Sequence, residues 1–518
     1  MGDALVTTLK GGGFPRVSLP EEVPALALLA HPDLSRMGEV ALLAGLVTGQ
    51  GVDLSRLSPS FGRAAGMEAP LNDPFLSRSA HVLRADADGA VTITPSSGSS
   101  PLELDGVYLS RPVLLDRERL RRGVVLLLGE RVALVLHLRK GPPHRSSGMG
   151  LVGCSDAMAR LEEQIDLVAD LEVPVLIRGE TGVGKELVAN ALHARSKRSA
   201  RKMVTVNMAA LAPSVAASEL FGHKKGAFTG ATSDHAGYFA QADGSTLFLD
   251  EIGDVPAEVQ PMLLRALESG EIQVVGGQTR GRVNVRLIAA TDLDLESAAR
   301  AGRFRAPLLE RLASYQIRVP PLNRRREDIG DLLLHFLTLE LQTIGQLSRL
   351  SPAGGVDVWL PARLAARLAL GDWPGNVRQL RNVVRQMVIS CRRQQTLTLD
   401  SGSVDVPGMM DDGDATDPSA PAEHPGDRGG AASDARIRET LASCRWDVTA
   451  AASRLGMSRT TLYERIARID NLRVAKELGE DELRAALIET GGDLEAMVDR
   501  LQVSRHGVAS RLRQLGLK

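Results

Sequence analysis

Short apolar runs separated by turn residues dominate the first part of the chain. Between residues 25 and 138 the runs ALALLA, VALL, AVTI, VVLLL and VALVLHL have the length of strands rather than helices. This pattern predicts an all-β sandwich over residues 25–140, preceded by a flexible N-terminus over 1–24 that is punctuated by Gly and Pro. The Gly- and Pro-containing segment that follows predicts a linker over 141–150.

Beyond the linker, buried-strand runs alternate with helical sequence. This alternation predicts an α/β domain over residues 151–320 and a helical domain over 321–400. Residues 401–433 carry seven acidic residues and one arginine among Gly, Pro and Ala. Because such a composition cannot bury much apolar surface, we predict a disordered acidic linker there.

The C-terminal part contains an internal repeat. The segment from Ile437 aligns without gaps on the segment from Leu483, in register with the apolar periodicity. Each copy indicates a helix, a short helix, a turn and a further helix, which is a helix-turn-helix pattern. We therefore predict two all-α modules in tandem, over residues 434–470 and 481–518.

A phosphate-binding loop opens the α/β domain. The segment PVLIRGETGVGKELVANALHA indicates a strand, a glycine loop and a helix, an order that makes a chance match improbable. Backbone N–H groups of the loop and the helix N-terminus suit the phosphates of ATP, and Lys185 would reach the β and γ phosphates. The predicted nucleotide-binding residues are Gly179, Glu180, Thr181, Gly182, Val183, Gly184, Lys185, Glu186, Thr291 and Asp292.

Two carboxylates end a second buried-strand pattern, STLFLDE. Asp250 is predicted to hold Mg²⁺, and Glu251 to polarise the attacking water. An ordinary strand with an acidic end is the alternative, which its place behind a phosphate loop disfavours. Net charge is −1, so a basic surface for nucleic acid must be local. No apolar run approaches 18 residues, so we expect no membrane partner and a cytoplasmic location.

The hexapeptide GAFTGA follows the phosphate loop by about forty residues. Its glycines allow a tight turn that presents an apolar tip, made of Gly226, Ala227, Phe228, Thr229, Gly230 and Ala231. Together with ELFGHKK before it and WPGNVRQL further on, this segment resembles the AAA+ ATPase domain of bacterial enhancer-binding proteins, the activators of sigma-54 RNA polymerase. The resemblance implies an AAA+ P-loop fold over residues 151–320 with a helical lid.

The resemblance also implies roles for further residues. Asn207 would restrain the catalytic Glu251, Thr291 would be sensor I, and Arg378 would contact the γ phosphate. Arg305 and Arg311, on one expected helix, would be fingers reaching a neighbouring subunit of a hexameric ring; solvated helix arginines are the alternative. Asp292 departs from the neutral residue that is more usual after the sensor threonine.

The two terminal regions carry weaker resemblances. The C-terminal repeats are similar to Fis-type modules that bind double-stranded enhancer DNA, with a degenerate packing unit as the alternative for the second. The residues expected at DNA are Ser458, Arg459, Thr460, Thr461, Arg465, Arg505, His506 and Arg511. The N-terminal sandwich resembles a forkhead-associated domain, which implies a phosphothreonine protein bound by Arg56, Ser77 and Arg78; a plain β-sandwich interaction domain is the alternative.

The modules together predict an ATP-dependent transcriptional activator. It would bind enhancer DNA and remodel closed complexes of sigma-54 RNA polymerase into open ones, under control of the N-terminal domain. Two alternatives stay open: a DNA-binding regulator or scaffold with a weakened ATPase, and a remodelling ATPase that acts on another target.

Overall fold

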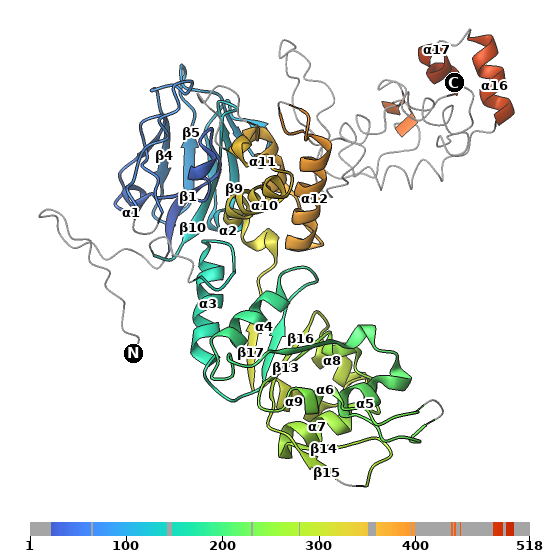
Figure 1. The fold of residues 1–518 in the computed structure, drawn as a ribbon. Coiled ribbons are helices and arrows are strands. Elements are labelled where there is room, and N and C mark those ends of the chain that lie inside the picture. Colours follow the sequence, from blue (N-terminus) through green and yellow to red (C-terminus); the bar gives the residue numbers. More distant parts are fainter. Residues whose placement is uncertain are drawn as a thin grey trace, which may run out of the picture. The chain divides into compact units, whose positions relative to one another are not determined.

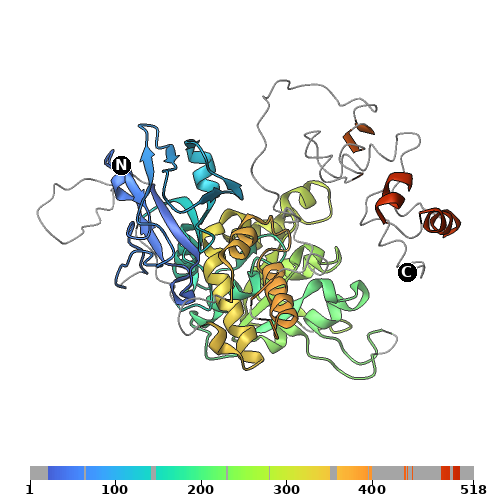
Figure 2. The ribbon, with the colours of Figure 1, turned by 90° about the horizontal axis from the view of Figure 1, so that it is seen from above.

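In the computed structural model the chain divides into two compact units, Met1–Gly413 and Asp414–Lys518 (Figures 1 and 2). The described residues are 22–63, 66–141, 148–228, 231–278, 280–350, 359–394 and 396–398 in the first unit, and 437–438, 440–441, 446, 480–490 and 494–501 in the second. Among the helices in these ranges, none combines the length and the hydropathy that a bilayer span requires.

Two antiparallel sheets form the β-rich N-terminal part, which we call the N-terminal β domain (residues 22–141). The larger sheet has the order β2-β1-β10-β9-β6-β7 and consists of β1 (Val23–Ala30), β2 (Val40–Leu42), β6 (Leu102–Leu104), β7 (Val107–Tyr108), β9 (Val124–Leu128) and β10 (Val132–Arg139). The smaller sheet, β3-β4-β5-β8, consists of β3 (Val52–Leu54), β4 (His81–Ala85), β5 (Val91–Thr94) and β8 (Val113–Leu115). Short helices lie at η1 (Leu34–Arg36), α1 (Ala44–Val47) and α2 (Arg117–Arg122).

Strand β9 shows why the apolar runs of this domain are continuous. Side chains alternate between the two faces of a strand. Val124, Leu126 and Leu128 contribute to the core between the two sheets. Val125 and Leu127 belong to a different core, which contains residues of the lid helices. The larger sheet is thus buried on both faces, and the two-sheet arrangement is consistent with the predicted sandwich.

The ATPase core is built on a five-stranded parallel sheet in the order β12-β13-β16-β11-β17. Its strands are β11 (Val175–Arg178), β12 (Val204–Asn207), β13 (Thr246–Asp250), β16 (Arg286–Thr291) and β17 (Tyr315–Arg318). The helices are α3 (Asp156–Val168), α4 (Lys185–Ala194), η2 (Met208–Ala210), α5 (Pro213–Phe221), α6 (Tyr238–Gln241), η3 (Ile252–Asp254), α7 (Gln260–Ser269), α8 (Leu295–Arg300) and α9 (Ala306–Leu312). A hairpin, β14 (Glu271–Gln273) and β15 (Arg280–Arg282), follows α7. The predicted site residues come at the carboxyl ends of the strands, where ligands of parallel sheets bind.

The lid packs directly on the N-terminal β domain (Figure 1). It consists of η4 (Leu322–Arg324), η5 (Arg326–Asp328), α10 (Ile329–Thr343), η6 (Leu347–Leu350), α11 (Ala362–Leu370) and α12 (Asn376–Ser390). One hydrophobic core, the lid core, joins Leu29 and Leu127 of the larger sheet to Leu364 of α11 and Leu380 of α12. At its edge Arg363 pairs with Glu103 at 2.6 Å and with Glu130 at 3.0 Å.

A buried carboxylate joins the lid to the start of the ATPase core. Asp328 accepts hydrogen bonds from the backbone N–H groups of Cys154 and Ser155 and from the Ser155 hydroxyl, each at 2.7 Å. Ser155 in turn caps α3 by accepting from the N–H of Met158. Beside it, burial raises the pKa of Glu327 to about 7.

In the second unit the structure describes two helices, α16 (Glu480–Glu489) and α17 (Leu494–Leu501). They coincide with the first two helices expected in the second predicted repeat. The residues expected at DNA, Ser458 to Arg465 and Arg505 to Arg511, lie outside the described residues, as does the whole of the predicted linker over 401–433.

Candidate functional site

The phosphate loop runs from β11 to α4 and closes around Lys185. This residue begins α4, its side chain is 7% exposed, and its Nζ donates to the carbonyl oxygen of Gly179 at 3.0 Å. Gly182 has φ +80°, and a Cβ there would lie 2.3 Å from the carbonyl oxygen of Gly375. Only glycine meets both demands, because other residues strain at positive φ and would collide with the lid. The structure thus has the expected order of a strand, a glycine loop and a helix, and nucleotide binding by this loop stays a prediction.

The two predicted carboxylates stand at the end of β13. Asp250 lies opposite Asn207 of β12 in the parallel register. Glu251 follows with φ +51°, an uncommon conformation for a residue with a side chain, and its Oε1 lies 3.7 Å from Lys185 Nζ. Burial raises the pKa of Glu251; Lys185 opposes this rise, and the Asp292 carboxylate adds to it. The structure thus brings the lysine, both acids and Asn207 to one edge of the sheet.

Asp292 contacts the phosphate loop. Its Oδ2 accepts a hydrogen bond from the hydroxyl of Thr181 at 2.6 Å. Thr291 before it is 1% exposed, and its Oγ1 accepts from the N–H of Leu293 at 3.1 Å. The acidic residue at this position is therefore held against the loop, in reach of the nucleotide site, and acts electrostatically on Glu251.

Asn376, at the start of α12, is a site residue that our sequence reasoning missed. Its Nδ2 donates to Glu180 Oε2 at 3.0 Å and to the carbonyl oxygen of Thr181 at 3.1 Å. Its Oδ1 accepts from the N–H of Leu322 at 2.8 Å. Two residues further, the N–H of Arg378 donates to the carbonyl oxygen of Gly182 at 3.2 Å. The GNVRQL segment carried the signal, but the resemblance assigned a role only to its arginine.

The two predicted finger arginines are exposed and lie at α9. Arg311 is in the helix, where its guanidinium donates weakly to the carbonyl oxygen of Leu267 at 3.3 Å. Arg305 was expected on the same helix but is the residue before it. The helix begins at Ala306, one residue after Arg305. Pro307 then lies in the first turn, where the N–H that proline lacks is not needed.

The described residues of the GAFTGA segment, 226–228 and 231, belong to two facing arms of one loop. Its base is closed by reciprocal backbone hydrogen bonds between His223 and His235, at 3.1 and 2.9 Å. Gly226 turns the chain with φ +82°, and its N–H donates to the carbonyl oxygen of Ala231 at 2.9 Å. Phe228 is 42% exposed, so it is not a core residue. Thr229 and Gly230 lie outside the described residues.

Three family models match the chain. They are the Sigma-54 interaction domain over residues 151–318, the AAA+ ATPase lid domain over residues 323–403, and the bacterial regulatory protein, Fis family, over residues 434–468. The chain therefore contains a sigma-54 interaction domain, followed by an AAA+ lid and a Fis-family segment. Its central domain is an AAA+ ATPase, and the resemblance drawn from the phosphate loop, the hexapeptide and the lid is confirmed.

Curated relatives share this central region. The chain is 46% identical over 272 residues to the anaerobic nitric oxide reductase transcription regulator NorR of Vibrio vulnificus (strain YJ016), covering 52% of this chain and 50% of the relative. It is 48% identical over 248 residues to the transcriptional regulatory protein ZraR of Escherichia coli (strain K12), covering 48% and 54%. It is 43% identical over 262 residues to the DNA-binding transcriptional regulator NtrC of Klebsiella pneumoniae, covering 50% and 54%. The chain thus spans about half the length of these relatives.

The predicted phosphopeptide residues lie at the two ends of one long connection, between β3 and β4 of the N-terminal β domain. The N–H of Arg56 donates to the carbonyl oxygen of Ser77 at 3.2 Å. The Ser77 hydroxyl donates to the carbonyl oxygen of Gly98 at 3.0 Å, and Arg78 beside it is exposed. The structure therefore brings the two ends of this connection together, beside Gly98 of the connection between β5 and β6.

Proposed function

We propose that this chain is an enhancer-binding regulator, an ATP-driven activator that remodels closed complexes of sigma-54 RNA polymerase into open ones. One observation carries the proposal. The folded unit that brings the candidate nucleotide-site residues together also carries a loop whose apolar Phe228 is exposed. The loop emerges directly after α5, which follows Asn207 at the edge of that site. A change at the nucleotide can therefore reach the loop through a short and well-packed path.

The residues present fit a Mg²⁺-bound nucleoside triphosphate. Lys185 Nζ and the loop N–H groups offer positive charge to the phosphates, and Asp250 is the carboxylate that would hold Mg²⁺. The bound metal neutralises charge on the phosphates during hydrolysis. Glu251 would orient the attacking water through a carboxylate oxygen and accept its proton. Arg305 and Arg311, both exposed, would complete the site of a neighbouring subunit in a hexameric ring.

The test is ATP-dependent open-complex formation on a promoter with enhancer DNA. The wild-type chain should form open complexes and Lys185→Ala should not. Thr229→Ala should hydrolyse ATP at close to the wild-type rate and form none, since it changes the loop alone. Normal open-complex formation by Thr229→Ala would refute the role of the loop. Binding of enhancer DNA by the wild type without ATP hydrolysis would instead support the alternative, a regulator with a weakened ATPase.

For regulation, we propose that the N-terminal β domain acts on the lid. The turn after β9 connects the two: Glu130 pairs with Arg363 of α11, and the next residue, Arg131, pairs with Asp73 at 2.7 Å. Asp73 lies in the loop between Arg56 and Ser77, whose ends are joined by the Arg56–Ser77 backbone bond. A ligand that reorders this loop would therefore shift a turn that is anchored on the lid.

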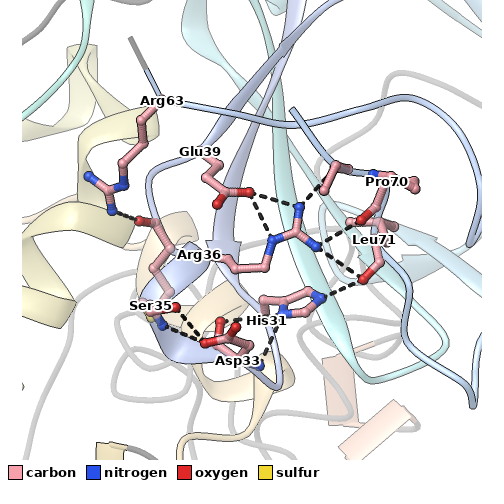
Figure 3. A network of polar contacts seen from close by, with 10 residues as sticks. His31, Asp33, Ser35, Arg36, Glu39, Arg63, Pro70 and Leu71 are labelled. Atoms are coloured by element: carbon pink, nitrogen blue, oxygen red, sulfur yellow. Dashed lines mark hydrogen bonds and ion pairs between the residues drawn. The ribbon is translucent and has the colours of Figure 1, made fainter. Parts of the chain in front are cut away.

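A polar network gives the same loop a second connection to the lid (Figure 3). Arg36 donates to the carbonyl oxygens of Ala69, Pro70 and Leu71 at 2.9, 2.8 and 3.2 Å. Arg63, from the same connecting segment, lies 3.4 Å from Asp331 of α10. Of the segment that precedes Asp73, residues 69–71 are thus held by hydrogen bonds from Arg36, and Arg63 is paired with Asp331 of the lid.

We propose a phosphothreonine protein as the ligand of these loops, because Arg56 and Arg78 supply charge and Ser77 a hydroxyl for phosphate oxygens. The probe is a degenerate phosphothreonine peptide library, compared with its unphosphorylated counterpart. Arg56→Ala and Ser77→Ala should abolish retention of phosphorylated peptides. Equal retention of both libraries, or of neither, would favour a plain interaction domain.

Arg363→Glu then tests the coupling, because it places a carboxylate against Glu103 and Glu130. Any effect of bound peptide on ATP hydrolysis should weaken in this variant, which leaves the connection through Arg63 and Asp331 in place. The control is Arg385→Glu, on α12, whose nearest paired acid, Glu340, belongs to the lid itself. A peptide effect that survives undiminished in Arg363→Glu would show that this pair does not transmit the signal.

A further inference from the structure

The imidazole of His223 connects three parts of the molecule at the base of the GAFTGA loop. Its Nδ1 and the Oγ of Ser218, in α5, form a hydrogen bond of 2.6 Å. Its ring meets the ring of Phe228 edge to face, with centroids 5.0 Å apart. On another side it stacks on His235, with centroids 5.4 Å apart. Phe228 therefore rests on a side chain that is itself bonded to α5.

The backbone beneath this imidazole is fixed on two sides. His223 exchanges backbone hydrogen bonds with His235. The residues that flank it bond to Val275, which follows β14: Val275 donates to Gly222 at 2.9 Å and accepts from Lys224 at 3.0 Å. Ser218 is 5% exposed, so its hydroxyl has little access to water as another partner. The position of the imidazole is thus determined by α5 and by two neighbouring segments.

The same residues form a path from the nucleotide site. Asn207 ends β12 opposite Asp250. Its side-chain oxygen accepts from the N–H of Ala209 at 2.9 Å and thereby caps the N-terminus of η2. Helix α5 follows η2 after a short connection and carries Ser218 near its C-terminal end. A displacement of α5 would move Ser218, and through the hydrogen bond the imidazole on which Phe228 lies.

We propose that His223 is a positioning residue for Phe228, transmitting movement of α5 to the exposed tip of the loop. This inference rests on the proposed function, in which that tip engages sigma-54. It assigns two separable tasks to one side chain. The ring packs against Phe228, and the hydrogen bond between Nδ1 and Ser218 ties the imidazole to α5.

Four variants of the full-length chain separate these tasks. His223→Ala removes both the ring and the hydrogen bond, His223→Phe keeps a ring without the bond, and Ser218→Ala removes the bond from the other side. The double variant Ser218→Ala/His223→Phe should be no worse than either single change, because both remove one hydrogen bond. The matched control is His335→Ala on α10, where a histidine ring meets Phe336 edge to face at 5.3 Å, remote from the loop in sequence.

Hydrogen exchange of the segment 223–236 reports the loop without sigma-54. His223→Ala should speed exchange there by roughly two- to tenfold, since an aromatic pair contributes about that factor to an equilibrium. Open-complex formation should fall for all four variants, while ATP hydrolysis and the melting temperature stay near wild type. His335→Ala should change neither exchange nor open-complex formation.

The outcomes separate the inference from the proposed function. Wild-type exchange and wild-type open-complex formation in His223→Ala would overturn the positioning role. A wild-type chain that opens no promoter would refute the proposed function. Faster exchange in His223→Ala would still show, in that case, that His223 supports Phe228. An additive loss in the double variant would show that Ser218 does not act through His223.

Discussion

Replacing Asn376 by alanine should detach the lid from the phosphate loop. The side chain is 1% exposed and makes three hydrogen bonds: to Glu180, to the carbonyl oxygen of Thr181 and from the N–H of Leu322. Its backbone has φ +50°, which asparagine adopts more readily than alanine. The substitution therefore removes the contacts and adds backbone strain in one step.

The magnitude follows from these contacts. Each neutral hydrogen bond contributes about 1 kcal/mol net, and the bond to the Glu180 carboxylate contributes about 2 kcal/mol. The left-handed backbone adds about 1 kcal/mol for alanine. Allowing for rearrangement, we expect a loss of about 3 kcal/mol from the lid–loop contact, which corresponds to a fall of roughly a hundredfold in ATP affinity if the contact forms only in the binding-competent state.

Titration of the chain with a fluorescent ATP analogue measures this loss. Asn376→Asp should be at least as damaging, because it loses both donors and places a carboxylate beside Glu180. Asn376→Gly should recover only the backbone part, since glycine accepts positive φ without strain. Asn323→Ala, an exposed position in η4, is the control. An ATP affinity for Asn376→Ala within twofold of wild type would refute the reasoning.

Three further predictions follow from the same region. Asp292→Asn should move the acid limb of the ATPase pH profile to lower pH, because it removes one of the charges that raise the pKa of Glu251, which must be deprotonated to act. Gly182→Ala should abolish ATP binding while the chain stays folded by circular dichroism, because its Cβ would lie 2.3 Å from the Gly375 carbonyl oxygen. Burial raises the pKa values of Glu327 and Asp328 to about 7, above their ordinary values of 4.5 and 3.8, so the folded chain binds more protons than the unfolded one near neutral pH. The free energy of unfolding should therefore fall as pH rises from about 4.5 to about 7 in denaturant titrations, and Glu327→Gln should flatten that dependence.

Local sequence motifs predicted where the candidate site residues lie in the fold, because these motifs encode local geometry. The phosphate loop follows a buried strand, Asp250 and Thr291 each end one, and the ends of neighbouring parallel strands lie at one edge of the sheet. The Thr181–Asp292 and Asn376–Glu180 bonds join residues 111 and 196 positions apart. No local pattern specifies such partners, so Asp292 was noticed only as unusual and Asn376 received no role.

The apolar runs predicted the strands of the N-terminal β domain but not what covers them. A continuous run such as VVLLL indicates burial on both faces, since alternate residues point in opposite directions. One face could be assigned to the second sheet. The other is covered by α10 and α11 of the lid, which are distant in sequence: the ion pair between Arg363 of α11 and Glu130 joins residues 233 positions apart. The apolar run predicts that both faces of the strand are buried, but only the folded structure shows which helices cover the second face.

In the proposed regulation, the lid would respond both to a ligand of the N-terminal β domain and to ATP. Leu127 of the larger sheet and Leu380 of α12 belong to the same core, and Asn376, one turn before Leu380, holds the phosphate loop. Because a close-packed core transmits displacement rather than absorbing it, a shift imposed by the N-terminal β domain must alter the lid's contact with the loop. Binding couplings are reciprocal. ATP must therefore change the affinity of an N-terminal ligand by the same factor by which that ligand changes the affinity of ATP, and either measurement reports the state of the lid.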